Sequence, residues 1–154
     1  MTTCAAAIGK GELTGKILQA KTEKAVTFEQ IAQAVGAHEV WVTSCIFGQN
    51  SMLPDQAKAL VDYLDLDDDV ATALQEFPLK GSLDQSVPVD PLIYRFHEIT
   101  QVYGTTMKAV IHEKFGDGIM SAIDFSIDIG KQENPKGDRV VVTYNGKFLP
   151  YKKW

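Results

Sequence analysis

The sequence predicts an α+β fold in which an all-helical domain is followed by a smaller domain of two helices and a β-hairpin. Apolar residues first recur at the spacing of amphipathic helices, and this period gives way to alternation in the last third of the chain. Residues 77–90 separate the two patterns, show no period, and contain two prolines and a glycine. We therefore expect a helical domain at residues 1–76, a linker at 77–90 and a second domain at 91–154.

The first domain is predicted to be a compact bundle of five short helices. Thr27 followed by Gln30 is a capping-box pattern that starts the second helix, and Gly36 ends it. Pro54 fits the first turn of a later helix, where no N–H is needed. The expected helices span residues 12–26, 28–35, 38–47, 54–64 and 68–76.

The second domain opens with a helix whose start is marked by Asp90 and Pro91. Asp is a preferred N-cap residue and Pro is favoured at the first helical position. Gly104 is expected to interrupt this helix. One of the two threonines that follow then caps a second helix, which ends near Phe115.

The end of the chain predicts a small β-sheet. Residues 123–129 alternate apolar and polar side chains, and residues 139–144 form a second strand rich in valine. Asn145-Gly146 is the pattern of a two-residue hairpin turn leading into residues 147–149. Because so small a sheet is marginally stable alone, we expect its apolar strands to need partners from another subunit.

Composition bounds the number of cores and predicts where the protein is found. A chain of 154 residues with 45% hydrophobic content can bury one or two small cores. No apolar run approaches the roughly 18 residues of a membrane span, and the first ten residues lack the pattern of a secretory signal. Cys4 and Cys45 show neither a disulfide nor a metal spacing. We expect a soluble cytoplasmic protein with reduced thiols and no membrane partner.

Residues 27–64 have the pattern of a repressor-like helix-turn-helix, which raises the question of DNA binding. The candidate recognition helix, residues 38–44, contains Glu39 and no lysine or arginine. Residues 1–85 carry six lysines, no arginine and twelve acidic residues, a net charge of −6. Since phosphate contacts supply most nucleic-acid affinity, we expect no nucleic-acid partner and interpret this domain as a packing or assembly module.

The remaining titratable clusters do not predict a metal site. His112-Glu113 lacks the second histidine that a metalloprotease helix carries four residues later. The aspartates within residues 65–69 lack the glycine and terminal glutamate of a calcium loop, so we interpret them as favouring a helix start. We expect both His97 and His112 to be solvated or capping residues.

The arginines are the most distinctive residues, because the chain has only Arg95 and Arg139 against thirteen lysines. Arg95 precedes Glu98 by three residues in a helical pattern, so the two side chains should be neighbours. Arg95 also borders an apolar stripe, where a guanidinium recognises anions better than an ammonium does. Spacing alone leaves two interpretations open, a structural ion pair and an anion-binding site.

Ser121 is a second candidate residue. It follows the glycine-bearing turn 116–118 at the entry to a strand, where backbone amides and a hydroxyl could face a small anion together. Taken alone, it could equally be a routine serine.

The chain closely resembles the cyanases (cyanate hydratases). The resemblance covers the whole chain and is most specific in the segments YRFHE at 94–98, QVYGTTMKA at 101–109, HEKFGDGIMSAI at 112–123 and NGKFLP at 145–150. It implies that the family's catalytic arginine, glutamate and serine correspond to Arg95, Glu98 and Ser121. His97 stands where an aromatic residue would be expected, outside these three positions.

The resemblance also implies the reaction and the assembly. The family decomposes cyanate with bicarbonate as co-substrate, giving carbamate, then ammonia and carbon dioxide, with no metal or organic cofactor. It forms homodecamers of five dimers with interlocked C-terminal strands and active sites shared between subunits. The alternative is a non-enzymatic, repressor-like DNA-binding regulator that senses a small anion.

Overall fold

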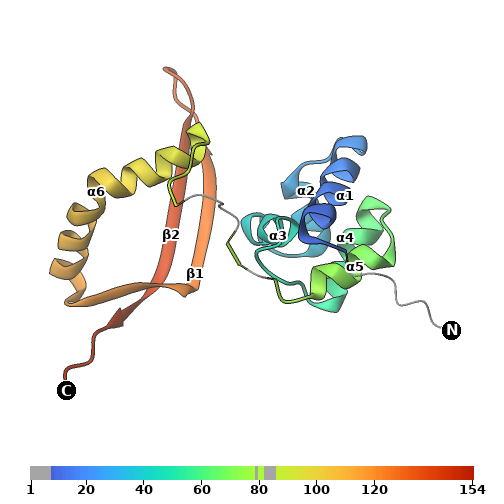
Figure 1. Cartoon of the computed structure of the whole chain (residues 1–154). Helices are drawn as coiled ribbons and strands as arrows, with labels where there is room; N and C mark the ends of the chain where they lie inside the picture. The colour runs from blue at the N-terminus through green and yellow to red at the C-terminus, as the bar shows by residue number, and fades with distance from the viewer. Residues whose placement is uncertain (1–7, 79, 82–85) are drawn as a thin grey trace. The chain divides into compact units, whose positions relative to one another are not determined.

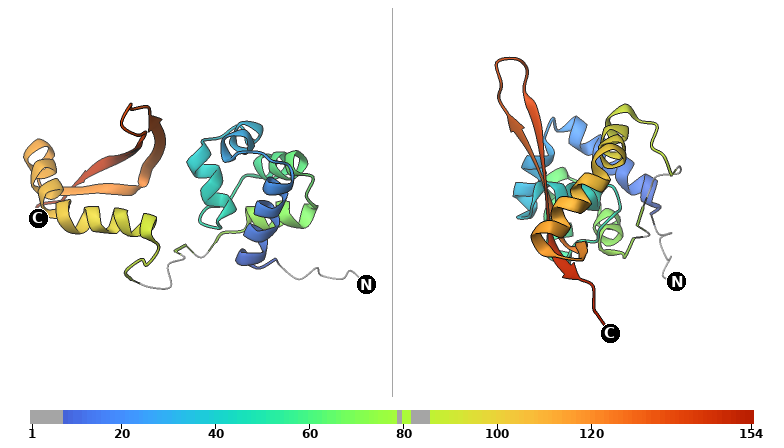
Figure 2. Two further views of the ribbon diagram at one scale, coloured as in Figure 1. Left: turned by 90° about the horizontal axis from the view of Figure 1, so that it is seen from above. Right: turned by 90° about the vertical axis from the view of Figure 1, so that its left-hand side faces the viewer.

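A computed structural model describes residues 8–78, 80–81 and 86–154 of the chain. Cys4 and part of the predicted linker lie outside the described residues. The chain divides into two compact units, of which the first ends at Gly81. Figure 1 and Figure 2 show the first unit as helical and the second as one long helix with a two-stranded sheet.

The first unit is built from five helices around a single apolar core. They are α1 (Lys10–Glu23), α2 (Phe28–Val35), α3 (Glu39–Ile46), α4 (Pro54–Leu64) and α5 (Asp68–Gln75). Each contributes side chains that are fully or almost fully buried: Ile17, Ile31, Val42, Cys45, Ile46, Leu60, Val61, Val70 and Leu74. Burial raises the pKa of the Cys45 thiol to about 11, which keeps it protonated and unreactive at neutral pH.

Local signals in the sequence set the ends of α2. The predicted capping box is confirmed. The backbone N–H of Gln30 donates to Thr27 Oγ1 at 3.1 Å, and the backbone N–H of Thr27 donates to the side-chain oxygen Oε1 of Gln30 at 2.9 Å. Gly36 then adopts the left-handed conformation with φ 74°, which a glycine reaches without steric cost. The turn to α3 follows directly.

The second unit begins with one continuous helix, α6 (Pro91–Phe115). The Asp90 carboxylate caps it by accepting from the amides of Leu92 and Ile93, both at 2.9 Å. The predicted break at Gly104 is therefore wrong, and the domain has one helix where two were expected. A glycine inside a helix costs only about 1 kcal/mol and removes no hydrogen bond, so without a proline it does not end the helix.

The sheet consists of β1 (Gly118–Gln132) and β2 (Arg139–Pro150), paired antiparallel. The predicted turn at Asn145-Gly146 is wrong, since these residues lie inside β2 opposite Ser126 and Phe125. The chain reverses at residues 133–138 instead. There the amide of Gly137 donates to the Asn134 carbonyl at 2.9 Å, and Gly137 has φ 116°.

The second unit has almost no interior of its own. Among its described residues only Gly118 and Ser121 are buried, and α6 has no buried residue at all. Figure 1 shows α6 and the sheet as sides of an open frame, joined where α6 passes into β1. The large apolar side chains exposed along α6 are Leu92, Ile93, Phe96, Ile99, Val102, Tyr103, Met107, Val110 and Phe115. An exposed apolar surface of this extent indicates an interaction face.

None of the helices in the described part of the chain combines the length and hydropathy that crossing a bilayer requires.

The capping box of α2 generates a prediction about stability. Thr27→Ala removes the acceptor of the Gln30 amide, and we expect the free energy of unfolding of the full-length protein to fall by about 1 kcal/mol. Thr27→Ser keeps the hydroxyl and is the matched control, which should remain within a few tenths of a kcal/mol of the wild type. Urea denaturation followed by helical circular dichroism measures both. Equal losses in the two variants would show that the hydroxyl does not stabilise the helix.

Candidate active site

Arg95 and Glu98 meet on the surface of α6 near its N-terminal end. Arg95 Nη1 lies 2.9 Å from Glu98 Oε2, so the contact predicted from their spacing is confirmed. Arg95 Nε also donates to the carbonyl of Pro91 at 3.3 Å, and the guanidinium lies 5.2 Å from the ring centroid of Tyr94. The contacts fix the plane of the guanidinium and leave several of its five N–H donors available to a ligand.

The exposure of the pair bears on its role. The side chains of Arg95 and Glu98 are 58% and 44% exposed within one chain. Ion pairs in contact with water contribute only about 0–1 kcal/mol to the free energy of folding. A gain in stability is therefore too small to account for the arginine at this position. The Glu98 carboxylate orients the Arg95 guanidinium, and the rest of the guanidinium is exposed to solvent.

Ser121 is buried, with 6% of its surface exposed. Its hydroxyl oxygen accepts hydrogen bonds from the amides of Ile123 and Asp124, both at 3.0 Å. A serine hydroxyl has two lone pairs and one proton, so these two bonds occupy its acceptor capacity and leave the O–H as a donor. Ser121 is therefore prepared to donate a hydrogen bond to an anion.

An irregularity of the sheet creates this arrangement. The pairing of β1 with β2 is regular up to Met120 and resumes at Phe125, so that residues 121–124 face Lys147 alone. The excess residues form a bulge within β1, in which the Ser121 hydroxyl accepts from the two backbone amides. A bulge next to a site is a common way to orient a side chain.

His112 holds the corner where α6 meets β1. Its Nε2 lies 3.2 Å from the carbonyl of Gly118 and 4.0 Å from the Asp117 carboxylate. Since a carbonyl can only accept, Nε2 carries the proton in this contact. His97 is half-buried, and its Nε2 is buried without a partner among the described residues, so this nitrogen is neither solvated nor capping as expected.

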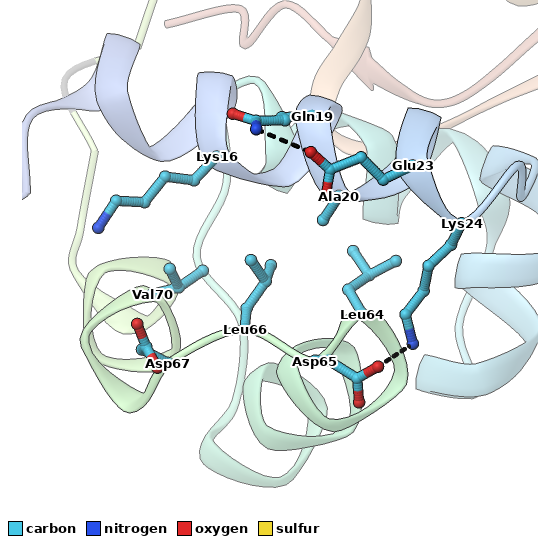
Figure 3. A pocket seen from close by; sticks show the side chains of 10 residues that line it. All are labelled: Lys16, Gln19, Ala20, Glu23, Lys24, Leu64, Asp65, Leu66, Asp67 and Val70. Atoms are coloured by element: carbon cyan, nitrogen blue, oxygen red, sulfur yellow. Dashed lines mark hydrogen bonds and ion pairs between the residues drawn. The ribbon is translucent and has the colours of Figure 1, made fainter.

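The acidic residues between α4 and α5 lie beside a cavity of about 410 Å³ in the first unit (Figure 3). Asp65 pairs with Lys24 at 2.6 Å and Asp69 pairs with Lys16 at 2.9 Å. The hydrogen bond from Lys16 lowers the pKa of Asp69, and the same bond raises the pKa of Lys16. Across the described residues no cluster of three or more histidine, cysteine or acidic side chains could hold a metal ion.

Comparison with known proteins identifies the family. Residues 10–78 match the model of the N-terminal domain of cyanate hydratase, and residues 85–153 match that of the cyanate lyase C-terminal domain. The cyanate hydratase of Synechococcus sp. (strain CC9311) is 56% identical over 149 residues, which cover 97% of this chain and 99% of that protein. The chain belongs to the cyanate hydratase family.

Further relatives of the family agree in sequence and in structure. The cyanate hydratase of Synechocystis sp. (strain ATCC 27184 / PCC 6803 / Kazusa) is 57% identical over 142 residues, covering 92% of this chain and 95% of that protein. The crystal structure of cyanase from T. urticae superimposes with a TM-score of 0.81 at 43% identity, covering 90% of this chain and 97% of that one. The alternative of a DNA-binding regulator is not favoured, because these relatives are named as cyanate hydratases or cyanase.

Within one chain of this cyanate hydratase family member, two of the three expected site residues lie together. Arg95 and Glu98 are in contact, whereas no hydrogen bond or ion pair in the described ranges joins either of them to Ser121. Glu98 lies 17 residues before the end of α6, about 25 Å of helix, and Ser121 follows that end. Sequence patterns did not identify Gly146 as a neighbour of Ser121, because Asn-Gly pairs usually mark turns.

Proposed function

We propose that this protein is a cyanate hydratase that decomposes cyanate with bicarbonate as co-substrate. The observation that carries the proposal is the match of both halves of the chain to cyanate hydratase domains and to full-length relatives of that name. The test is ammonia release from cyanate by the purified protein, with and without bicarbonate, against a protein-free blank. Release that does not depend on bicarbonate would contradict the proposed co-substrate, and no release at all would contradict the function.

The proposed reaction joins two small anions and then breaks two bonds. A bicarbonate oxygen attacks the cyanate carbon, and the resulting dianion loses one carbon dioxide and takes up a proton on nitrogen to give carbamate. Carbamate takes up a second proton and separates into ammonia and another carbon dioxide. The sum is one cyanate, one bicarbonate and two protons giving one ammonia and two carbon dioxide, and it needs no redox partner and no cofactor.

Bringing two anions together is the physical difficulty of this reaction, and the proposed roles follow from it. Arg95 offsets the combined charge through the N–H groups that its contact with Glu98 leaves available. Ser121 donates its O–H to one anion, because its acceptor capacity is taken by backbone amides. Glu98 orients Arg95 and relays a proton, which it first takes up from solvent, to the nitrogen that leaves as ammonia.

We further propose that the working enzyme is a cytoplasmic homo-oligomer, a decamer of five dimers with interlocked C-terminal strands. The decamer rests on the family resemblance. Two features of the chain support an oligomer, namely the exposed apolar surface of α6 and the lack of a contact between Ser121 and the Arg95–Glu98 pair. The repressor-like helical unit then serves packing or assembly, since α3 contains no basic residue with which to bind DNA.

Arg95→Lys tests the role of the guanidinium. Lysine keeps the charge but lacks the planar set of donors, so we expect kcat/KM for cyanate to fall more than tenfold, about 1.4 kcal/mol or more, with the oligomer intact. The matched control is Arg139→Lys, which changes the other arginine, at the start of β2, and should leave kcat/KM unchanged. Steady-state ammonia release and light scattering measure the two quantities. Equal kinetics of the two variants would remove the proposed role of Arg95.

Mixed oligomers test whether the site is shared. Arg95→Ala and Ser121→Ala chains should each be inactive alone and should regain activity when unfolded and refolded together. If each site takes Arg95 from one chain and Ser121 from another, random mixing restores about one site in four. Ammonia release by oligomers verified to contain both chains measures the recovery. Recovery near zero would place Arg95 and Ser121 of a site in the same chain.

A further inference from the structure

Gly146 lies where β2 passes the bulge that contains Ser121. It pairs with Phe125, the residue at which the regular ladder resumes. A β-carbon at position 146 would lie 2.5 Å from the carbonyl oxygen of Ser121, 2.5 Å from Met120 Cγ and 3.2 Å from Met120 Sδ. The first two distances are shorter than van der Waals contact. Any larger residue at position 146 would therefore force the Ser121 carbonyl or the Met120 side chain to move.

The two obstacles differ in how easily they can move. Met120 has a flexible side chain that can adopt another rotamer at low cost. The Ser121 carbonyl is part of the backbone, and the hydroxyl of the same residue is bonded to the amides of Ile123 and Asp124 at 3.0 Å. The carbonyl therefore cannot move away without displacing the bulge that fixes the hydroxyl.

The backbone conformation of Gly146 does not itself require glycine. Its φ lies outside the positive range, in contrast to the φ of Gly116 and Gly137. An alanine at this position is compatible with the local backbone, and only space opposes it. The close approach of the strands is thus the physical reason for a glycine here.

We propose that Gly146 is a positioning residue of the active site: the absence of a side chain lets β2 lie against the Ser121 carbonyl, and this contact sets the place of the Ser121 hydroxyl. The inference rests on the proposed function, in which Ser121 donates to the anionic substrates. It assigns to the Asn145-Gly146 dipeptide a role in the site in place of a turn.

The test compares Gly146→Ala with Gly130→Ala, a matched control in the same hairpin. Gly130 also has no positive φ, and a β-carbon there would meet only ordinary contacts with Val141 at 4.0 Å. We expect Gly146→Ala to lower kcat/KM for cyanate tenfold to a hundredfold per assembled chain, with the melting temperature and oligomer size close to those of the wild type. Gly130→Ala should stay within twofold. A loss of melting temperature with kcat/KM per assembled chain unchanged would overturn the proposal.

A second variant separates the two obstacles. Met120→Ala combined with Gly146→Ala removes the side-chain contact but leaves the Ser121 carbonyl in place, so the proposal expects activity to remain low. Recovery of wild-type activity in the double variant would show that Met120 is the obstacle and would overturn it. Failure of both variants to assemble would also overturn it, because Gly146 would then be a folding residue.

A crystal structure of Gly146→Ala distinguishes this proposal from the proposed function. Displacement of the Ser121 carbonyl and hydroxyl is expected, whereas an unmoved Ser121 would overturn the positioning role. If Ser121 moves but the wild-type protein releases no ammonia from cyanate, the geometric inference stands and the proposed function fails.

Discussion

Antiparallel pairing of β1 with β2 is the interaction on which the second unit depends. The helix α6 buries no residue, so apolar packing within one chain contributes little to this unit. The backbone ladder instead runs from Gly118 paired with Pro150 to Gln132 paired with Arg139. An isolated two-stranded sheet is at best marginally stable in water, so this ladder and the apolar side chains beside it need further cover.

The same ladder also creates the most specialised local geometry in the chain. Where its register shifts, residues 121–124 form a bulge opposite Lys147, and the Ser121 hydroxyl is fixed by two backbone amides. A donor held in place before the ligand arrives costs no reorganisation during a reaction. The irregularity is therefore better understood as a built feature of the sheet than as a defect in it.

The first unit differs in its energetics and in its chemistry. Its five helices bury a continuous apolar core. Asp65, between α4 and α5, pairs with Lys24 just after α1, and Asp69 in the first turn of α5 pairs with Lys16 of α1. The sequence of α2 and α3 resembles the pattern of a helix-turn-helix, but α3 carries no lysine or arginine for phosphate contacts. The likeness to that pattern is therefore not by itself an argument for DNA binding.

The sequence alone determined the features that depend on residues close together in the chain. The capping box at Thr27, the start of α6 after Asp90 and the contact of Arg95 with Glu98 involve residues two or three positions apart, so their geometry follows from the helix itself. The continuity of α6 through Gly104 is also local, because the small cost of one glycine does not end a helix. Tertiary structure decided the position of Asn145-Gly146 within β2 and the bulge at Ser121. In these two cases a weak local turn preference competes with a long ladder, and the many hydrogen bonds between strands far apart along the chain outweigh it.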